Sequence, residues 1–339
     1  MGKITNLFAC SFISLLAAVP IGASNHEGLI EGAKKEGKLV LYTSMTVDQA
    51  QKLNDVFGVK YPFLQVSMFR AVGERLLTKI LTEAQAGRYE FDVVQSAETQ
   101  AYFLKKRNLL GKYLSPEAKN LPKGFFDPQG YWSAIYMMPN VIAYNTRMVK
   151  RDKVPRTDEE LLNPKWKGKF SLEREETGWF LALMEHWGEE KGKSFFQALG
   201  AQIPTIRSGH TLLAQLIIAG EDPMSPNASN HHFPRAQKRG APADWNNLEP
   251  VIGHGIVTGL AKNAPHPHAA MLFIDFLFSK DGGQKMVHEA NRIATHPDLL
   301  PDPPRLREGF DFILVDPAKY LDKIHHYEKL WREWVLREK

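Results

Sequence analysis

Residues 37–69, GKLVLYTSMTVDQAQKLNDVFGVKYPFLQVSMF, decide the fold. The stretch begins with KLVLYT, a run of β-branched and aromatic residues that predicts a strand. Val47, Ala50, Leu53 and Phe57 then recur at the spacing of one helix face, and FLQVSMF predicts a second strand. Because a helix usually connects parallel neighbouring strands, this stretch predicts a β-α-β unit.

The pattern continues toward the C-terminus. Residues 73–87 predict an amphipathic helix and residues 91–98 a third strand, so the first hundred residues read β-α-β-α-β. This order is typical of an α/β fold with a mostly parallel, doubly wound sheet flanked by helices. Residues 131–146, YWSAIYMMPNVIAYNT, are apolar and extended, as expected of a segment that crosses between two lobes.

The second half repeats the theme. Residues 169–172 and 204–209 predict strands, each followed by helical segments, and residues 223–229 are extended. The segment 231–240, HHFPRAQKRG, begins another helix, and Pro234 places its start near His232 because proline is tolerated only in the first turn. An amphipathic helix at residues 320–339 is expected to pack on one of the lobes.

Composition narrows the class of protein. The chain has 339 residues, of which 43% are hydrophobic and 24% charged, which is ordinary for a globular protein of two domains. The formal net charge of +5 is not concentrated in any one segment, so no nucleic-acid partner is expected. We find no nucleophile–base motif, so a secreted α/β enzyme is only a remote alternative, and no cofactor is expected.

The N-terminus predicts export. Residues 1–24 contain one cation, Lys3, then an apolar run and small residues, which is typical of a signal peptide cleaved near Ala23 or Ser24. The only cysteine, Cys10, lies within this segment. The mature chain would therefore be periplasmic and free of thiols, which excludes cysteine-based metal or redox chemistry.

Polar residues follow several of the predicted strands. In open α/β sheets, ligands bind beyond the carboxyl ends of strands and at helix N-termini. Taken singly, Ser, Thr and Asn at these places are common helix caps, and Arg207 can equally pair with an acid on its own lobe. The candidates share this topological position: Thr43, Ser44, Thr46, Ser96, Glu98, Thr177, Gly178, Arg207, His210, Asn230, His231 and His232.

Several segments together resemble the periplasmic solute-binding proteins of ABC importers, in the family typified by ferric-ion-binding proteins. They are EGAKKEGKLVLYTS, GRYEFDVV, VIAYNTRMV, LLNPKWKGKFSL, QLIIAGEDP, KRGAPADW and APHPHAAMLFIDFLFSKDGGQ, and they run from about Leu29 to about Pro297. The resemblance implies two α/β lobes that close around a ligand by hinge bending. It also implies an inner-membrane ABC permease with its ATPase as partner, and we expect a monomer.

The resemblance carries ligand positions as well. Iron-binding members use a histidine after the first strand, an acid after the third, and a tyrosine pair before a late helix of the second lobe. Here these positions fall at Thr46, at Ala97 next to Glu98, and at His231–His232. The histidine pair therefore occupies the ligand position of the family.

Two ligand classes remain open. A small organic anion, a carboxylate or a phosphate, is the first reading, with Arg207 giving bidentate recognition beside Thr43, Ser44, Thr177 and Gly178. The alternative is a metal ion held by His231 and His232, because neutral imidazole suits zinc, copper, nickel or ferrous iron better than ferric iron. The expected organisation is a signal peptide at residues 1–24, a first lobe at 25–135, a second lobe at 136–250, and a return to the first lobe plus C-terminal helices at 251–339.

Overall fold

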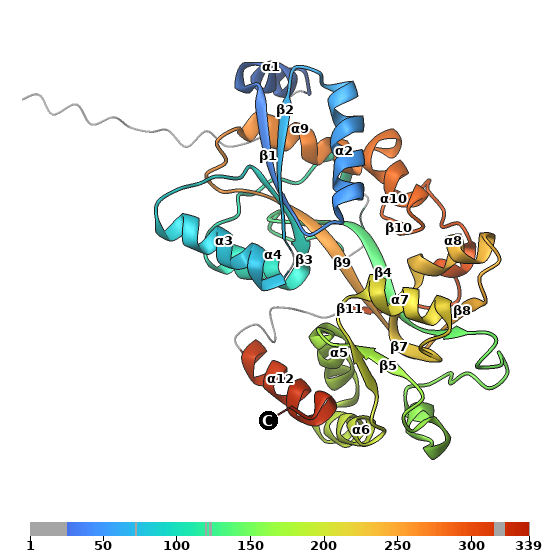
Figure 1. The fold of residues 1–339 in the computed structure, drawn as a ribbon. Coiled ribbons are helices and arrows are strands. Elements are labelled where there is room, and N and C mark those ends of the chain that lie inside the picture. Colours follow the sequence, from blue (N-terminus) through green and yellow to red (C-terminus); the bar gives the residue numbers. More distant parts are fainter. Residues whose placement is uncertain (1–25, 72, 119–120, 122–123, 315–322, 339) are drawn as a thin grey trace, which may run out of the picture.

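The computed structural model describes residues 26–338 except 72, 119–120, 122–123 and 315–322. The predicted signal peptide, with Cys10 and the expected cleavage site, lies outside the described residues. Figure 1 shows two α/β lobes joined by long strands, so the two-lobed fold class is confirmed. No helix in the described part of the chain has the length and apolar character that a membrane crossing requires.

The first lobe contains the β-α-β-α-β unit that the sequence predicts. Strand β1 pairs in parallel with both β2 and β3, so these three strands form one side of the main sheet. Burial of Leu39 and Leu41 in the sheet, and of Leu53 and Phe57 in the following helix, packs the layers together. The elements are α1 (His26–Glu36), β1 (Lys38–Thr43), α2 (Val47–Lys60), β2 (Gln65–Arg70), α3 (Gly73–Gln85), β3 (Val93–Ala97), α4 (Glu98–Lys106) and η1 (Pro116–Ala118).

Two antiparallel strands join the lobes. Strand β4 (Ser133–Asn145) pairs with β9 (Val251–Leu260) through residues 133–139, and with β7 (Met224–Ser229) and β8 (Ala243–Asn247) through residues 140–145. Strand β9 also pairs with β3 and, at its other end, with β11 (Phe312–Leu314). Every residue of β4 is buried, because the strand lies at the centre of both lobes.

The second lobe holds the shorter elements. Strand β5 pairs in parallel with β6, and each is followed by a helix that begins at the carboxyl end of the strand. The elements are η2 (Glu159–Leu162), η3 (Pro164–Trp166), β5 (Ser171–Glu173), α5 (Thr177–Trp187), α6 (Glu189–Ala201), β6 (Thr205–Arg207), α7 (His210–Ala219), η4 (Asn230–His232) and α8 (Phe233–Lys238).

After β9 the chain returns to the first lobe. Helix α9 lies against α1 and β1, as Figure 1 shows, and strand β10 pairs with residues 136–137 of β4. The elements are α9 (Pro267–Phe278), η5 (Lys280–Gln284), α10 (Lys285–Glu289), β10 (Ile293–Ala294) and η6 (Pro304–Leu306).

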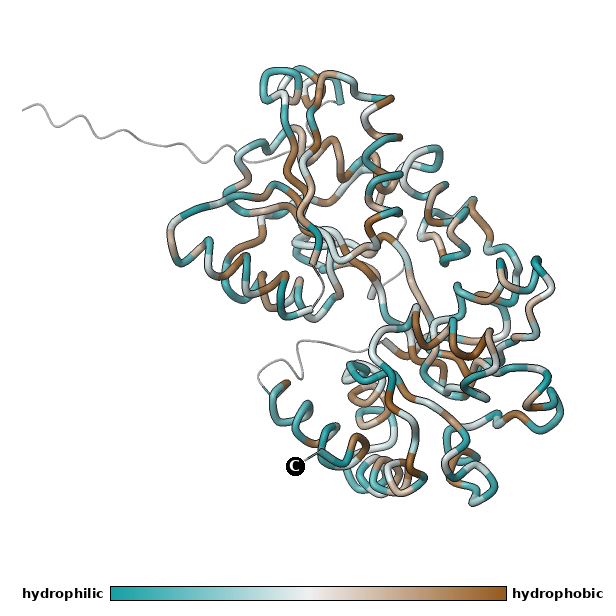
Figure 2. The backbone as a smooth tube through the Cα atoms, in the orientation of Figure 1, coloured by the Kyte–Doolittle hydropathy of each residue, from teal (hydrophilic) through white to brown (hydrophobic). Residues whose placement is uncertain are grey.

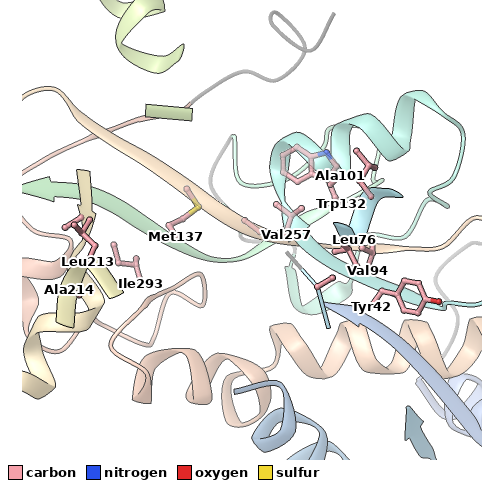
Figure 3. Close-up of a cluster of buried hydrophobic side chains, with 14 of the residues drawn as sticks. Tyr42, Leu76, Val94, Ala101, Trp132, Met137, Leu213, Ala214, Val257 and Ile293 are labelled. Carbon is pink, nitrogen blue, oxygen red and sulfur yellow. The ribbon is translucent and has the colours of Figure 1, made fainter. Parts of the chain in front are cut away.

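One apolar cluster runs through the junction of the lobes. It contains Val94 of β3, Met137 of β4, Leu213 of α7 and Ile293 of β10, all of which Figure 3 labels. Figure 2 shows the hydrophobic residues concentrated along the strands and the inner sides of the helices. The junction is therefore a packed core that holds the strand ends of both lobes in place.

The C-terminal helix belongs structurally to the second lobe. Helices α12 (Ile324–Trp331) and η8 (Arg332–Leu336) lie against α5 and α6, as Figure 1 shows. Trp331 is only 2% exposed, contacts Trp179, Phe180 and Phe196, and donates a hydrogen bond of 2.6 Å from Nε1 to the carbonyl of Arg174. The expected segment 251–339 is thus shared: α9 and α10 pack on the first lobe and the terminal helix packs on the second.

Candidate functional site

Four histidines gather where the crossing strands meet the second lobe. His210 is the first residue of α7, and His231 and His232 lie in η4 directly after β7. His254 lies in β9 opposite Met138 of β4. The rings of His231 and His232 are 4.0 Å apart, and those of His210 and His254 are 6.2 Å apart and stacked. His210, His232 and His254 all act electrostatically on His231, so the group combines the ends of two strands of the second lobe with one crossing strand, although no three of its ring nitrogens lie within 4.8 Å of one another.

Glu176 is the hydrogen-bond partner of His210. Its Oε1 lies 2.6 Å from Nε2 of His210, and its Oε2 accepts a 3.1 Å hydrogen bond from Nδ2 of Asn140. Glu173 lies nearby, but its two oxygens accept from the backbone amides of Gly209 (2.8 Å) and Glu175 (2.5 Å). Ligand atoms of Glu173, Glu176 and His210 fall within 4.8 Å of one another, yet protein donors already occupy these carboxylates.

The environment keeps three imidazoles uncharged. Burial, followed by the charges of His232 and Arg292, places the pKa of His231 well below its ordinary value. Burial and the charge of His210 lower the pKa of His232 to about 4, and burial also lowers the pKa of His254. These rings are therefore neutral at neutral pH, and each carries a nitrogen lone pair.

His210 behaves differently. Burial opposes its protonation, but the charge and hydrogen bond of Glu176 outweigh burial and raise the pKa of His210. The attraction of His210 in turn outweighs burial at Glu176 and lowers the pKa of that carboxyl. Nδ1 of His210 and Nδ1 of His231 are buried and have no hydrogen-bond partner among the described residues. Two buried imidazole nitrogens thus lack a protein partner, and Nδ1 of His210 can bind a metal ion when the ring has released its second proton.

Arg292 adds a positive charge to the site. Its guanidinium lies 4.2 Å from the ring centroid of Tyr136, and the side chain is 8% exposed. Its Nε is buried and finds no hydrogen-bond acceptor in the described part of the chain. Because the charge of Arg292 lowers the pKa values of His231, His232 and His254, it lies close enough to act on a ligand bound there.

Residues 89–314 match the family of bacterial extracellular solute-binding proteins, which is two thirds of the chain. The chain belongs to this family. Its members are the solute-binding components of ABC transporters, and this chain has that role.

Relatives of this solute-binding protein include two proteins of Synechocystis sp. The iron uptake protein A2 is 26% identical over 292 residues, covering 78% of this chain and 79% of the relative. The iron uptake protein A1 is 28% identical over 287 residues, covering 76% of each chain.

Solved structures share the fold. Iron-bound HitA from Pseudomonas aeruginosa superposes with a TM-score of 0.76 at 18% identity, covering 87% of this chain and 98% of HitA. AfuA from Actinobacillus pleuropneumoniae, with fructose-6-phosphate bound, gives a TM-score of 0.74 at 24% identity, covering 88% of this chain and 99% of AfuA.

The candidates of the first lobe in this solute-binding protein are mostly engaged with their own lobe. Thr43 donates a 2.9 Å hydrogen bond to Oε1 of Gln95, and Ser96 donates one of 3.2 Å to the carbonyl of Ala97. The hydroxyl of Ser44 is buried without a partner among the described residues, while Thr46 is exposed before α2. Ser44 is therefore a buried first-lobe hydroxyl whose hydrogen-bonding capacity no described residue uses.

Glu98 lies at the start of α4, against β9. A Cβ at Gly255 would come within 2.7 Å of its Oε1, so only glycine leaves room for the carboxyl. Burial raises the pKa of Glu98 to about 8, although a hydrogen bond from the backbone of Gly255 opposes the rise. At neutral pH this carboxyl is therefore protonated in the folded protein.

Replacing Glu98 with glutamine is expected to flatten the pH dependence of stability. Unfolding frees the carboxyl to ionise near its ordinary pKa of 4.5, so the wild type loses stability as pH rises from about 4.5 to about 8. The neutral amide of Glu98→Gln does not titrate, so urea unfolding at pH 5 and pH 9 should show a smaller loss, by more than about 1 kcal/mol. Exposed Glu90→Gln is the matched control, and equal losses in wild type and Glu98→Gln would contradict the expectation.

The candidates of the second lobe outside the histidine group differ in whether protein atoms already bind their side chains. Thr177 and Gly178 form the first turn of α5, half-buried and adjacent to Glu176. Asn230 donates a 3.1 Å hydrogen bond from Nδ2 to the carbonyl of Leu306. Arg207 donates two hydrogen bonds to Asp222, of 3.0 and 2.7 Å, which is the own-lobe ion pair that the sequence left open. The guanidinium of Arg207 is thus bound to Asp222.

Four residues of this solute-binding protein's site were not predicted: Asn140, Glu176, His254 and Arg292. His254 stands alone in the apolar strand sequence VIGHGIV, and a polar residue there is the one local signal that could have found it. Glu176 directly precedes Thr177, which was a candidate. Asn140 and Arg292 join the site only through the pairing of β4 with β7 and β10.

Proposed function

We propose that this solute-binding protein captures one transition-metal ion at the histidine group, formed by His210, His231, His232 and His254, and delivers it to an inner-membrane permease. The permease would be driven by its ATPase, and the protein would act as a periplasmic monomer after removal of residues 1–24. The family and the two Synechocystis relatives named for iron uptake support a role in transport.

The observation that carries the metal proposal is the state of the imidazoles. The low pKa values of His231, His232 and His254 leave neutral rings, which is the form that binds metal ions. A nitrogen-rich group favours zinc, copper, nickel or ferrous iron, whereas ferric iron favours phenolate and carboxylate oxygens. The proposed cargo is therefore a divalent ion of this borderline class.

A small organic anion is the second candidate, because Arg292 has a buried guanidinium with an unused Nε. AfuA, which shares the fold, is described with fructose-6-phosphate bound. The residue on which the sequence-based anion reading depended, Arg207, is paired with Asp222, so an anion would have to rely on Arg292 instead.

Native mass spectrometry of the protein purified gently from its periplasm separates the two candidates. We expect a mass excess of one metal ion that EDTA removes, and we expect Arg207→Ala to retain that ion because its guanidinium is bound to Asp222. An excess of a few hundred daltons that survives EDTA and disappears on denaturation would overturn the metal proposal. Loss of the ligand in Arg207→Ala would instead support an organic anion bound by Arg207.

A further inference from the structure

His210 presents its two ring nitrogens to different surroundings. Nε2 lies 2.6 Å from a carboxylate oxygen of Glu176, which can only accept a hydrogen bond when ionised. Nδ1 is buried and has no hydrogen-bond partner among the described residues. In a neutral imidazole, a proton held on Nε2 by the carboxylate leaves the lone pair on Nδ1.

Glu176 is itself held in place. Asn140 donates from Nδ2 to Oε2 of Glu176 at 3.1 Å, and the same nitrogen lies 3.3 Å from the carbonyl of Asn227. Asn140 belongs to β4 and faces Ser229 across the strand pair, and the histidine-bearing η4 begins at the next residue. The carboxylate therefore connects the crossing strand to the N-terminus of α7.

Glutamine cannot replace Glu176 without loss of a hydrogen bond. Its two oxygens each accept from a donor, the Nε2–H of His210 and the amide of Asn140. A glutamine has one acceptor and one NH₂ group, so it can satisfy only one of these two donors. If its NH₂ group faces His210, the ring must take the other tautomer, with the proton on Nδ1.

We infer that Glu176 is a positioning residue that fixes His210 in the Nε2–H tautomer, so that Nδ1 is the nitrogen that coordinates the metal ion. Asn140 orients the carboxylate for this task. The inference rests on the proposed function, because it assigns the role of one residue beneath the proposed metal site. Carboxylates that orient a ligating imidazole in this way typically contribute about 10- to 100-fold to metal affinity.

The test compares Glu176→Gln with Glu175→Gln, a matched control in which an exposed neighbouring glutamate loses the same charge. Zn²⁺ affinity is measured by competition with a chromophoric chelator, and the ¹⁵N shifts of the His210 ring report its tautomer in the metal-free protein. We expect Glu176→Gln to bind Zn²⁺ about 10- to 100-fold more weakly. We also expect its His210 ring to change from the Nε2–H tautomer to the Nδ1–H tautomer. Glu175→Gln should keep both properties. Asn140→Ala, a second variant, should lose affinity in the same direction and carries the test if Glu176→Gln does not fold.

The outcomes separate the inference from the function on which it rests. A wild-type protein that binds none of Zn²⁺, Ni²⁺, Cu²⁺ and Fe²⁺ would overturn the proposed function. A wild type that binds Zn²⁺ while Glu176→Gln keeps both its affinity and its Nε2–H tautomer would overturn the inference alone. Complete loss of Zn²⁺ binding with an unchanged tautomer would also overturn it, because Glu176 would then be a direct ligand.

Discussion

Replacing His231 and His232 together by alanine is expected to weaken metal binding by more than about 100-fold, since loss of a residue that merely orients a ligand already costs about 10- to 100-fold. The two rings lie 4.0 Å apart, and Nδ1 of His231 is buried without a partner among the described residues. Isothermal titration of the metal-free protein with Zn²⁺ measures the effect.

The chain supplies its own control. His325 and His326 form a second adjacent pair in α12, where both rings are exposed, so His325→Ala with His326→Ala should leave Zn²⁺ affinity unchanged. Equal effects of the two double substitutions would remove the basis for placing the site at His231 and His232. Unchanged Zn²⁺ binding in both double variants would equally contradict a site at His231 and His232.

The second large effect is expected on stability. Trp331→Ala should lower the free energy of unfolding by about 3–5 kcal/mol, because it removes a large side chain from a packed aromatic group and leaves a cavity. Trp331 is 2% exposed, makes edge contacts with Trp179 and Phe196, and donates a hydrogen bond to the carbonyl of Arg174. Chemical denaturation of the two proteins gives the difference.

A matched substitution tests whether burial is the cause. Leu300 is 76% exposed, so Leu300→Ala should change the free energy of unfolding by less than about 0.5 kcal/mol. If Trp331→Ala is as mild, the terminal helix does not stabilise the second lobe. The prediction would also be contradicted if the transition split so that only the first lobe was destabilised.

The sequence predicts the first lobe well because its information there is local. Hydrophobic spacing located α2 and α3, and the β-α-β order required parallel pairing of β1, β2 and β3. Even so, Thr46 precedes α2 without making the side-chain hydrogen bond that its residue type favours. Propensity located the helix start but did not fix its cap.

The histidine group could be predicted only in part. His210, His231 and His232 follow strands in sequence, so their place at strand ends was a local inference. His254 joins them because β4 pairs with β9, and Glu176 meets His210 because β5 pairs with β6, and spacing along the chain reveals neither pairing. Arg207 met Asp222 for the same reason, since the choice between a protein acid and a ligand depends on tertiary contacts.

The shared strands also set the order in which the protein can be completed. Strands β5 to β8 of the second lobe lie between β4 and β9 in the chain, so they are synthesised before the first sheet receives β9 and β10. Val93 of β3 pairs with Leu260 of β9, so one edge of β3 stays open while everything between them leaves the ribosome. Contacts so distant in sequence form slowly, because a long loop must close before they contribute stability. A nascent chain halted before residue 251 therefore carries strands β4 to β8 but lacks β9 and β10 of the first sheet and the terminal helix that packs on the second lobe.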